Sequence, residues 1–175
     1  QSHVLEYFKK GENIFITGPA GSGKSYIIRQ IVDYAKENDI SHQVCAMTGC
    51  AAFLLGCGAT TLHSWSGVGI MNRPVSEIIQ HINRSKYLRK RWTKTDLLIV
   101  DEVSMMTMSL FELLDSIGRK FRNVDLPFGG IQVILSGDFH QLAPPSDLEK
   151  YCFESNLWDK NLPRQVELNK IFRQR

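Results

Sequence analysis

The sequence lacks the features of a secreted, membrane-spanning or zinc-bound protein. It has no run of about eighteen apolar residues and no signal-peptide pattern, so we expect a soluble intracellular protein with no membrane partner. Its 4 cysteines show no C-x-x-C pairing and no partner histidines, and we interpret them as reduced and mostly structural. The 21 basic and 18 acidic residues leave a net charge of only +3, which is compatible with a nucleic-acid partner but does not demonstrate one.

The length suits one globular domain. With 175 residues, 43% of them hydrophobic, the chain can bury a full core but cannot form two large domains. It begins with Gln and ends inside a patterned segment, so we expect a domain of a longer protein. The compartment stays open between nucleus, mitochondrion, cytoplasm and a viral replication site.

Strand-like and helix-like segments alternate along the chain. We expect strands at residues 13–17, 43–47, 96–100, 131–135 and 165–168, and helices at 1–10, 27–35, 51–55, 75–92 and 106–121, with a short one beginning at 156–158. Residues 57–72 have the Gly, Ser and Thr content of a loop. This order predicts an α/β fold with a mostly parallel central sheet, helices on both faces, and ligands at the carboxyl ends of the strands.

Residues 18–25 fit the phosphate-binding loop pattern G-x-x-x-x-G-K-[ST] between a predicted strand and a predicted helix. Glycines let main-chain N–H groups and the positive end of the helix point at an anion. Lys24 would reach the β- and γ-phosphates, and the Ser25 hydroxyl would ligate Mg²⁺. The alternative, a glycine-rich turn that only caps a helix, explains less of the pattern. The predicted nucleotide-binding residues are Gly18, Pro19, Ala20, Gly21, Ser22, Gly23, Lys24 and Ser25.

Acidic residues follow the apolar run at 96–100. Asp101 is placed to hold Mg²⁺, and Glu102 can accept a proton from the attacking water, although two acidic residues can also simply solvate a strand end. Residues 136–145 follow another buried strand and should emerge at the same edge of the sheet. Phe139 and the pair Pro144-Pro145 could face a second ligand there.

These motifs together resemble the first RecA-like motor domain of the petite-integration-frequency (PIF) DNA helicases, a RecD-like branch of superfamily one. The matching stretches are residues 18–25, 48–52, 61–67, 101–105 and 137–145, which extend over nearly the whole chain. His140 and Ala143 stand where many relatives have an aromatic residue and a proline, and nothing matches the second motor domain. The resemblance implies a P-loop NTPase domain over residues 1–168, with 169–175 starting the connection to a second RecA-like domain.

The resemblance also implies an activity and further site residues. It implies ATP and Mg²⁺ as cofactors, 5′-to-3′ movement on single-stranded or forked DNA, a monomer, and work in DNA replication, repair, recombination or telomere maintenance. Gln1 would read adenine, Gln141 would sense the γ-phosphate, and Arg173 would meet that phosphate. With Lys24 and Glu102, Gln141 and Arg173 complete the expected catalytic set.

Small and hydroxyl residues at 48–52 and 61–67 would let main-chain N–H groups approach phosphates, as single-strand binding requires. Alternatives stay open for His63 and Trp65, which can be structural, and for the basic run 84–94, which can solvate a helix or extend a DNA footprint. The expected DNA contacts are Thr48, Gly49, Ala51, Thr61, His63, Ser64, Phe139 and Pro144.

The leading hypothesis is therefore an ATP-driven DNA translocase domain. Its rival within the enzymes is a P-loop ATPase or nucleoside kinase that does not move on DNA, and stimulation of ATP turnover by oligodeoxythymidine separates the two. A third hypothesis concerns the fragment alone, which without a second domain would bind nucleotide and DNA weakly and show little hydrolysis or unwinding.

Overall fold

The computed structural model describes residues 2–140 and 148–169. Its described strands form one six-stranded sheet in the order β3-β2-β4-β5-β1-β6, with every neighbouring pair parallel. This confirms the expected α/β fold with a parallel sheet. The strands are β1 (Ile14–Thr17), β2 (His42–Ala46), β3 (Thr60–Thr61), β4 (Leu97–Asp101), β5 (Gln132–Gly137) and β6 (Arg164–Glu167).

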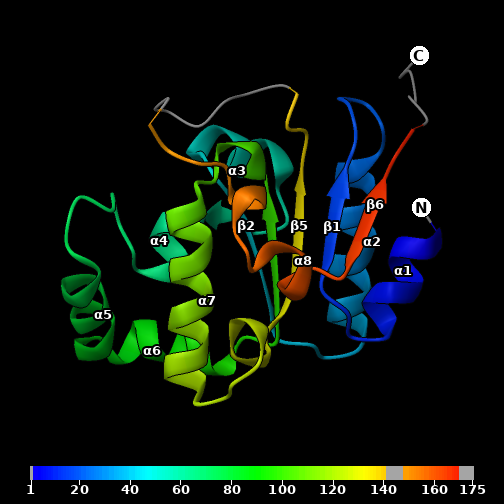
Figure 1. Ribbon diagram of the computed structural model, residues 1–175. Coiled ribbons are helices and arrows are strands. Elements are labelled where there is room, and N and C mark those ends of the chain that lie inside the picture. Colours follow the sequence, from blue (N-terminus) through cyan, green and yellow to red (C-terminus); the bar gives the residue numbers. More distant parts are fainter. Residues whose placement is uncertain (1, 141–147, 170–175) are drawn as a thin grey trace.

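Helices cover both faces of this sheet, and Figure 1 shows α7 in front of it and α2 behind it. The α-helices are α1 (Ser2–Lys9), α2 (Lys24–Glu37), α3 (Gly49–Leu55), α4 (Leu62–Ser66), α5 (Val75–Arg84), α6 (Lys86–Lys94), α7 (Met108–Arg122) and α8 (Trp158–Asn161). Short 3₁₀ turns are η1 (Val103–Met105), η2 (Pro127–Gly130) and η3 (Cys152–Glu154).

Each central strand divides its apolar side chains between two cores. In β4, Leu97 and Ile99 enter the core with α1 and α2, whereas Leu98 and Val100 enter the core with α4, α6 and α7. Successive side chains of a strand point to opposite faces, so a strand buried on both sides must be apolar throughout. Burial of β4 on both faces explains the continuous apolar run at residues 96–100.

Two expectations from the sequence were wrong. Residues 57–72 are not only loop, since they contain β3 and α4. Residues 75–92 are not one helix, because Ser85 has an extended backbone that ends α5, and its hydroxyl accepts a hydrogen bond from the Leu88 N–H to begin α6. Serine at such a position competes with the helix for main-chain hydrogen bonds and favours a cap.

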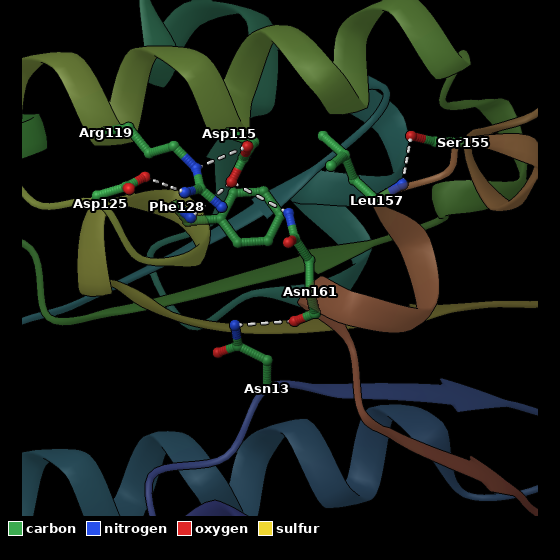
Figure 2. A network of polar contacts seen from close by, with 8 residues as sticks. All are labelled: Asn13, Asp115, Arg119, Asp125, Phe128, Ser155, Leu157 and Asn161. Carbon is green, nitrogen blue, oxygen red and sulfur yellow. Dashed lines mark hydrogen bonds and ion pairs between the residues drawn. The ribbon is translucent and has the colours of Figure 1, made fainter.

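A buried polar network joins α7, η2 and α8 (Figure 2). One Asp115 oxygen accepts hydrogen bonds from the Phe128 N–H at 2.8 Å and from Asn161 Nδ2 at 3.0 Å, and the other accepts from Arg119 Nε at 2.9 Å. Asn13, just before β1, donates to the Asn161 carbonyl at 3.0 Å. Burial of a carboxylate is costly unless it is fully paired, and this one is. The network fixes the helical layer against the strand that leads into residues 18–25.

Candidate functional site

The loop of residues 18–25 joins the carboxyl end of β1 to α2. Gly23 is the N-cap of α2 in a left-handed conformation with φ 97°, which glycine adopts without strain. A Cβ atom on Gly18 would lie 2.8 Å from the Leu168 carbonyl oxygen, so the loop packs on the end of β6 only because that position has no side chain. The predicted strand, glycine loop and helix are confirmed.

Lys24 folds back into this loop. Its ammonium donates to the Gly18 carbonyl and, at 3.0 Å, to the Pro19 carbonyl. Burial lowers the pKa of Lys24, and the negative charges of Asp138, Asp101 and Glu102, in that order, oppose the decrease. The loops after β1, β4 and β5 therefore place one ammonium and these carboxylates at the same edge of the sheet, as expected for neighbouring parallel strands.

Asp101 ends β4 and is partly buried. Burial raises the pKa of its carboxyl group, and the positive charge of Lys24 opposes that increase. Its carboxylate and the exposed hydroxyl of Ser25 are hard oxygen donors of the kind that Mg²⁺ takes when it keeps several waters and binds substrate phosphates. The donor chemistry of this pair therefore fits Mg²⁺.

Glu102 has an unusual backbone. It lies in the left-handed region with φ 63° and ψ 37°, although it is not a glycine. Such strain persists only where the surroundings enforce it, and it concentrates at functional positions. One neighbour that enforces it is Gly137, where an added Cβ would lie 3.1 Å from the Val103 nitrogen. The close approach of β5 to the turn after β4 therefore packs the main chain directly beyond Glu102.

The predicted DNA contacts begin at the same edge of the sheet. Ala46 at the end of β2 pairs with Asp101 on one side and with Thr61 on the other. Thr48 caps α3 by accepting from the Ala51 N–H at 3.1 Å, and Thr61 caps α4 by accepting from the Ser64 N–H at 3.3 Å. A capping hydroxyl still has its own hydrogen to donate to a phosphate. Both helix starts lie at the same carboxyl edge of the sheet as Asp101, on the side of β4 away from β1.

With this geometry established, the chain can be compared with known proteins. A family model described as PIF1-like helicase matches residues 2–175. The chain belongs to the PIF1-like helicase family. It is 42% identical over 176 residues to the ATP-dependent DNA helicase RRM3 of Saccharomyces cerevisiae, and this match includes 95% of the chain but only 24% of the yeast protein.

Solved structures of PIF1-like helicases share the fold. The crystal structure of Pif1 helicase from Candida albicans matches with a TM-score of 0.90 and 37% identity, over 98% of this chain and 39% of that one. The Pif1 helicase from Bacteroides in complex with ADP-AlF3 and single-stranded DNA matches with a TM-score of 0.81 and 29% identity, over 99% of this chain and 42% of that one. The RecA-like fold is thereby confirmed.

Other predicted positions of this PIF1-like chain fall in different settings. Gly49 and Ser64 are exposed, and Ala51, Thr61 and His63 are half-buried; burial lowers the pKa of His63. Trp65 is buried, with its ring 5.0 Å from that of Trp92, which favours its structural interpretation.

Phe139 packs among aromatic rings. Its ring centroid lies 4.6 Å from that of Phe153 and 5.3 Å from that of Phe15. Much of the ring surface therefore packs against other side chains of the protein. Its contact with DNA stays a prediction. Gln1, Gln141, Pro144 and Arg173 lie outside the described residues.

Sequence reasoning missed one member of the site. Asp138 was part of a recognised motif but received no role, and its charge is the one that acts most strongly on Lys24. Its Oδ1 also accepts from the His140 N–H at 3.0 Å, which shapes the turn after β5. The available signal was its position directly after a buried strand.

The cysteine interpretation agrees with the structure, in which all the cysteines are free. Burial raises the pKa of the Cys45 and Cys152 thiols to about 12, which keeps them protonated. None of the helices within residues 2–140 and 148–169 is long and apolar enough to cross a membrane.

Proposed function

We propose that this chain is the first RecA-like motor domain of an ATP-dependent DNA helicase that moves 5′-to-3′ along single-stranded DNA. The observation that carries the proposal is the arrangement at the carboxyl edge of the parallel sheet, where the glycine loop after β1 leads into Lys24 and β4 ends at Asp101, directly before Glu102. The chain spans about a quarter of the yeast relative, so activity of the whole protein also depends on parts beyond this domain.

In this proposal Lys24 leaves the Gly18 and Pro19 carbonyls to contact the β- and γ-phosphates of ATP. Ser25 and Asp101 would hold Mg²⁺, which when bound would neutralise charge that develops on the phosphate oxygens. Glu102 accepts a proton from the water that attacks the γ-phosphate. The left-handed backbone at Glu102 supports this role because it fixes where the carboxylate stands.

The remaining nucleotide contacts are carried over from the family pattern. We assign adenine recognition to Gln1, γ-phosphate sensing to Gln141, and stabilisation of the transition-state charge to Arg173. A second RecA-like domain of the same protein would supply the opposite wall of the site, and one protomer would suffice for activity.

For DNA, we propose that the starts of α3 and α4 bind the phosphodiester backbone of single-stranded or forked DNA. Their threonine caps and the exposed Gly49 and Ser64 leave N–H and O–H donors near the surface. A relative with the same fold, Pif1 from Bacteroides, was crystallised with single-stranded DNA. The full proposed set of DNA contacts is Thr48, Gly49, Ala51, Thr61, His63, Ser64, Phe139 and Pro144.

The test is Lys24→Ala in the whole protein, measured as ATP hydrolysis with and without oligodeoxythymidine. Loss of the ammonium removes charge stabilisation at the phosphates, and we expect turnover to fall by about 100-fold or more. Lys36→Ala on the exposed face of the same helix is the matched control and should leave turnover unchanged. Retained turnover in Lys24→Ala would contradict the proposal. Wild-type turnover that oligodeoxythymidine does not stimulate would favour an ATPase or kinase that does not move on DNA.

A further inference from the structure

The helix that begins with the DNA-binding candidates is too short to stand alone. Helix α4 has only five residues, and isolated helices of that length are not stable in water. Its last carbonyl groups have no partner within the helix and need donors from elsewhere. Whatever supplies those donors also fixes the direction in which Thr61, His63 and Ser64 face.

Helix α6 supplies them. Arg91 Nη1 donates to the Ser64 and Trp65 carbonyls, both at 3.1 Å, and Trp92 Nε1 donates to the Ser66 carbonyl at 2.9 Å. The positive guanidinium at the carboxyl end of α4 also complements the helix dipole. The guanidinium lies 4.2 Å from the Tyr87 ring centroid, one turn earlier on α6, which orients it toward α4.

The contact between the two helices is close as well as polar. Gly67, the C-cap of α4, has φ 83°, and a Cβ atom there would lie 2.8 Å from Leu88 Cδ1. The Trp65 and Trp92 rings pack 5.0 Å apart beneath it. Helix α6 is itself held in the same manner, since Arg122 of α7 donates to the Trp92, Thr93 and Thr95 carbonyls.

The basic run 84–94 is therefore not uniform. None of the hydrogen bonds and ion pairs found among the described residues uses the side-chain charge of Lys86, Lys90 or Lys94, whereas Arg91 is committed to the carbonyls of α4. We propose that Arg91 is a positioning residue for single-stranded DNA binding, which holds α4 so that Thr61, His63 and Ser64 meet the DNA backbone. This inference rests on the proposed function.

The experiment measures binding of labelled oligodeoxythymidine by fluorescence anisotropy, with the whole protein at several salt concentrations. For Arg91→Met we expect Kd to rise about tenfold at every salt concentration, because hydrogen bonds from a charged donor are lost while no phosphate contact is. The slope of log K against log salt should stay that of the wild type. A direct phosphate contact would instead reduce the slope by about 0.7 for a single strand.

Three further measurements sharpen this result. The oligodeoxythymidine concentration for half-maximal ATPase should rise in Arg91→Met, with kcat at saturating DNA unchanged. Amide hydrogen exchange should quicken at residues 62–67 but not in the sheet. Lys90→Met removes the same charge from the adjacent exposed position and should change none of these quantities.

If Arg91→Met does not fold, Arg91→Lys replaces it, since it keeps the charge but not the planar group that stacks on Tyr87, and it should still raise Kd. Unchanged Kd in the folded variant, or a loss confined to low salt with a reduced slope, overturns the inference. An equal loss in Lys90→Met overturns it too and assigns DNA binding to the exposed basic face. Failure of the wild type to bind oligodeoxythymidine would contradict the proposed function instead.

Discussion

The surroundings of Asp115 differ from those of Asp101 and Glu102. Asp115 is buried, and its oxygens accept hydrogen bonds from Phe128, Asn161 and Arg119 (Figure 2). Asp101 and Glu102 are partly exposed, and Lys24 donates to the main-chain carbonyls of the glycine loop rather than to them. The first arrangement is complete without a ligand, whereas the second keeps carboxylate oxygens available for one.

This difference indicates that Asp115 stabilises the fold, whereas Asp101 and Glu102 are available to bind a ligand. A buried carboxylate whose oxygens both have partners is costly to disturb, because every donor left behind loses its partner. A partly desolvated carboxylate with fewer partners costs stability but can still bind a ligand. Substitutions of Asp101 and Glu102 should therefore reduce activity without loss of stability, whereas substitution of Asp115 should reduce stability.

The largest expected effect is that of Glu102→Gln on catalysis. Glutamine keeps the size and the left-handed backbone but cannot accept the proton, so kcat for ATP should fall by about 100-fold or more. Nucleotide affinity and the unfolding temperature should change little, which steady-state kinetics, equilibrium nucleotide binding and thermal unfolding can measure.

Glu77→Gln, on the exposed side of α5, is the control for Glu102→Gln. If kcat is unchanged in both variants, Glu102 has no catalytic role and its strained backbone serves the fold only. Glu102 would then not differ from Asp115 in the way proposed.

The second prediction concerns Asp115→Asn. All three of its contacts are donors, so an asparagine NH₂ group would face a donor in either orientation. We expect a loss of about 3 kcal/mol in the free energy of unfolding, or about 8 °C in Tm. Chemical and thermal unfolding measure the change.

Asp125→Asn gives the matched control, because Asp125 pairs with the same Arg119 at 2.7 Å but its side chain is 99% exposed. Its effect should stay within about 0.5 kcal/mol. Equal losses in the two variants would show that the Arg119 ion pair, and not the saturated carboxylate, stabilises this layer.

The sequence predicted these two groups unequally well. Asp101 and Glu102 were found because the apolar run before them dictates a buried strand, and a parallel sheet gathers strand ends at one edge. Asp115 gave no such signal, since it is one charged residue in an amphipathic helix, and two of its three partners are 13 and 46 residues away. Pairing at that distance depends on how the layers pack.

The missed elements have similar causes. Helix α4 has five residues, too few to display a helical period, and its local signals are the two caps, Thr61 and Gly67. The break at Ser85 had two signals: the step of six residues from Ile82 to Leu88 departs from helical spacing, and the Ser85 hydroxyl caps α6. Arg91 looked like one charge in a basic run, because the carbonyls that it contacts lie 26 and 27 residues earlier.

The smallest expected effect is that of Asp101→Asn on thermal stability in the absence of nucleotide. Burial raises the pKa of Asp101 in the folded chain, so the folded state disfavours its ionised form relative to the unfolded state. Stability from this group is then lost as pH rises from the ordinary aspartate pKa through the raised one, and Asp101→Asn should restore it.

Without nucleotide, we expect Tm of Asp101→Asn to exceed the wild type by about 2 °C at neutral pH and to equal it well below pH 4. Magnesium-dependent nucleotide binding should weaken in the same variant. A lower Tm at neutral pH would mean that Asp101 stabilises the fold as Asp115 does, and the distinction between the two groups would fail.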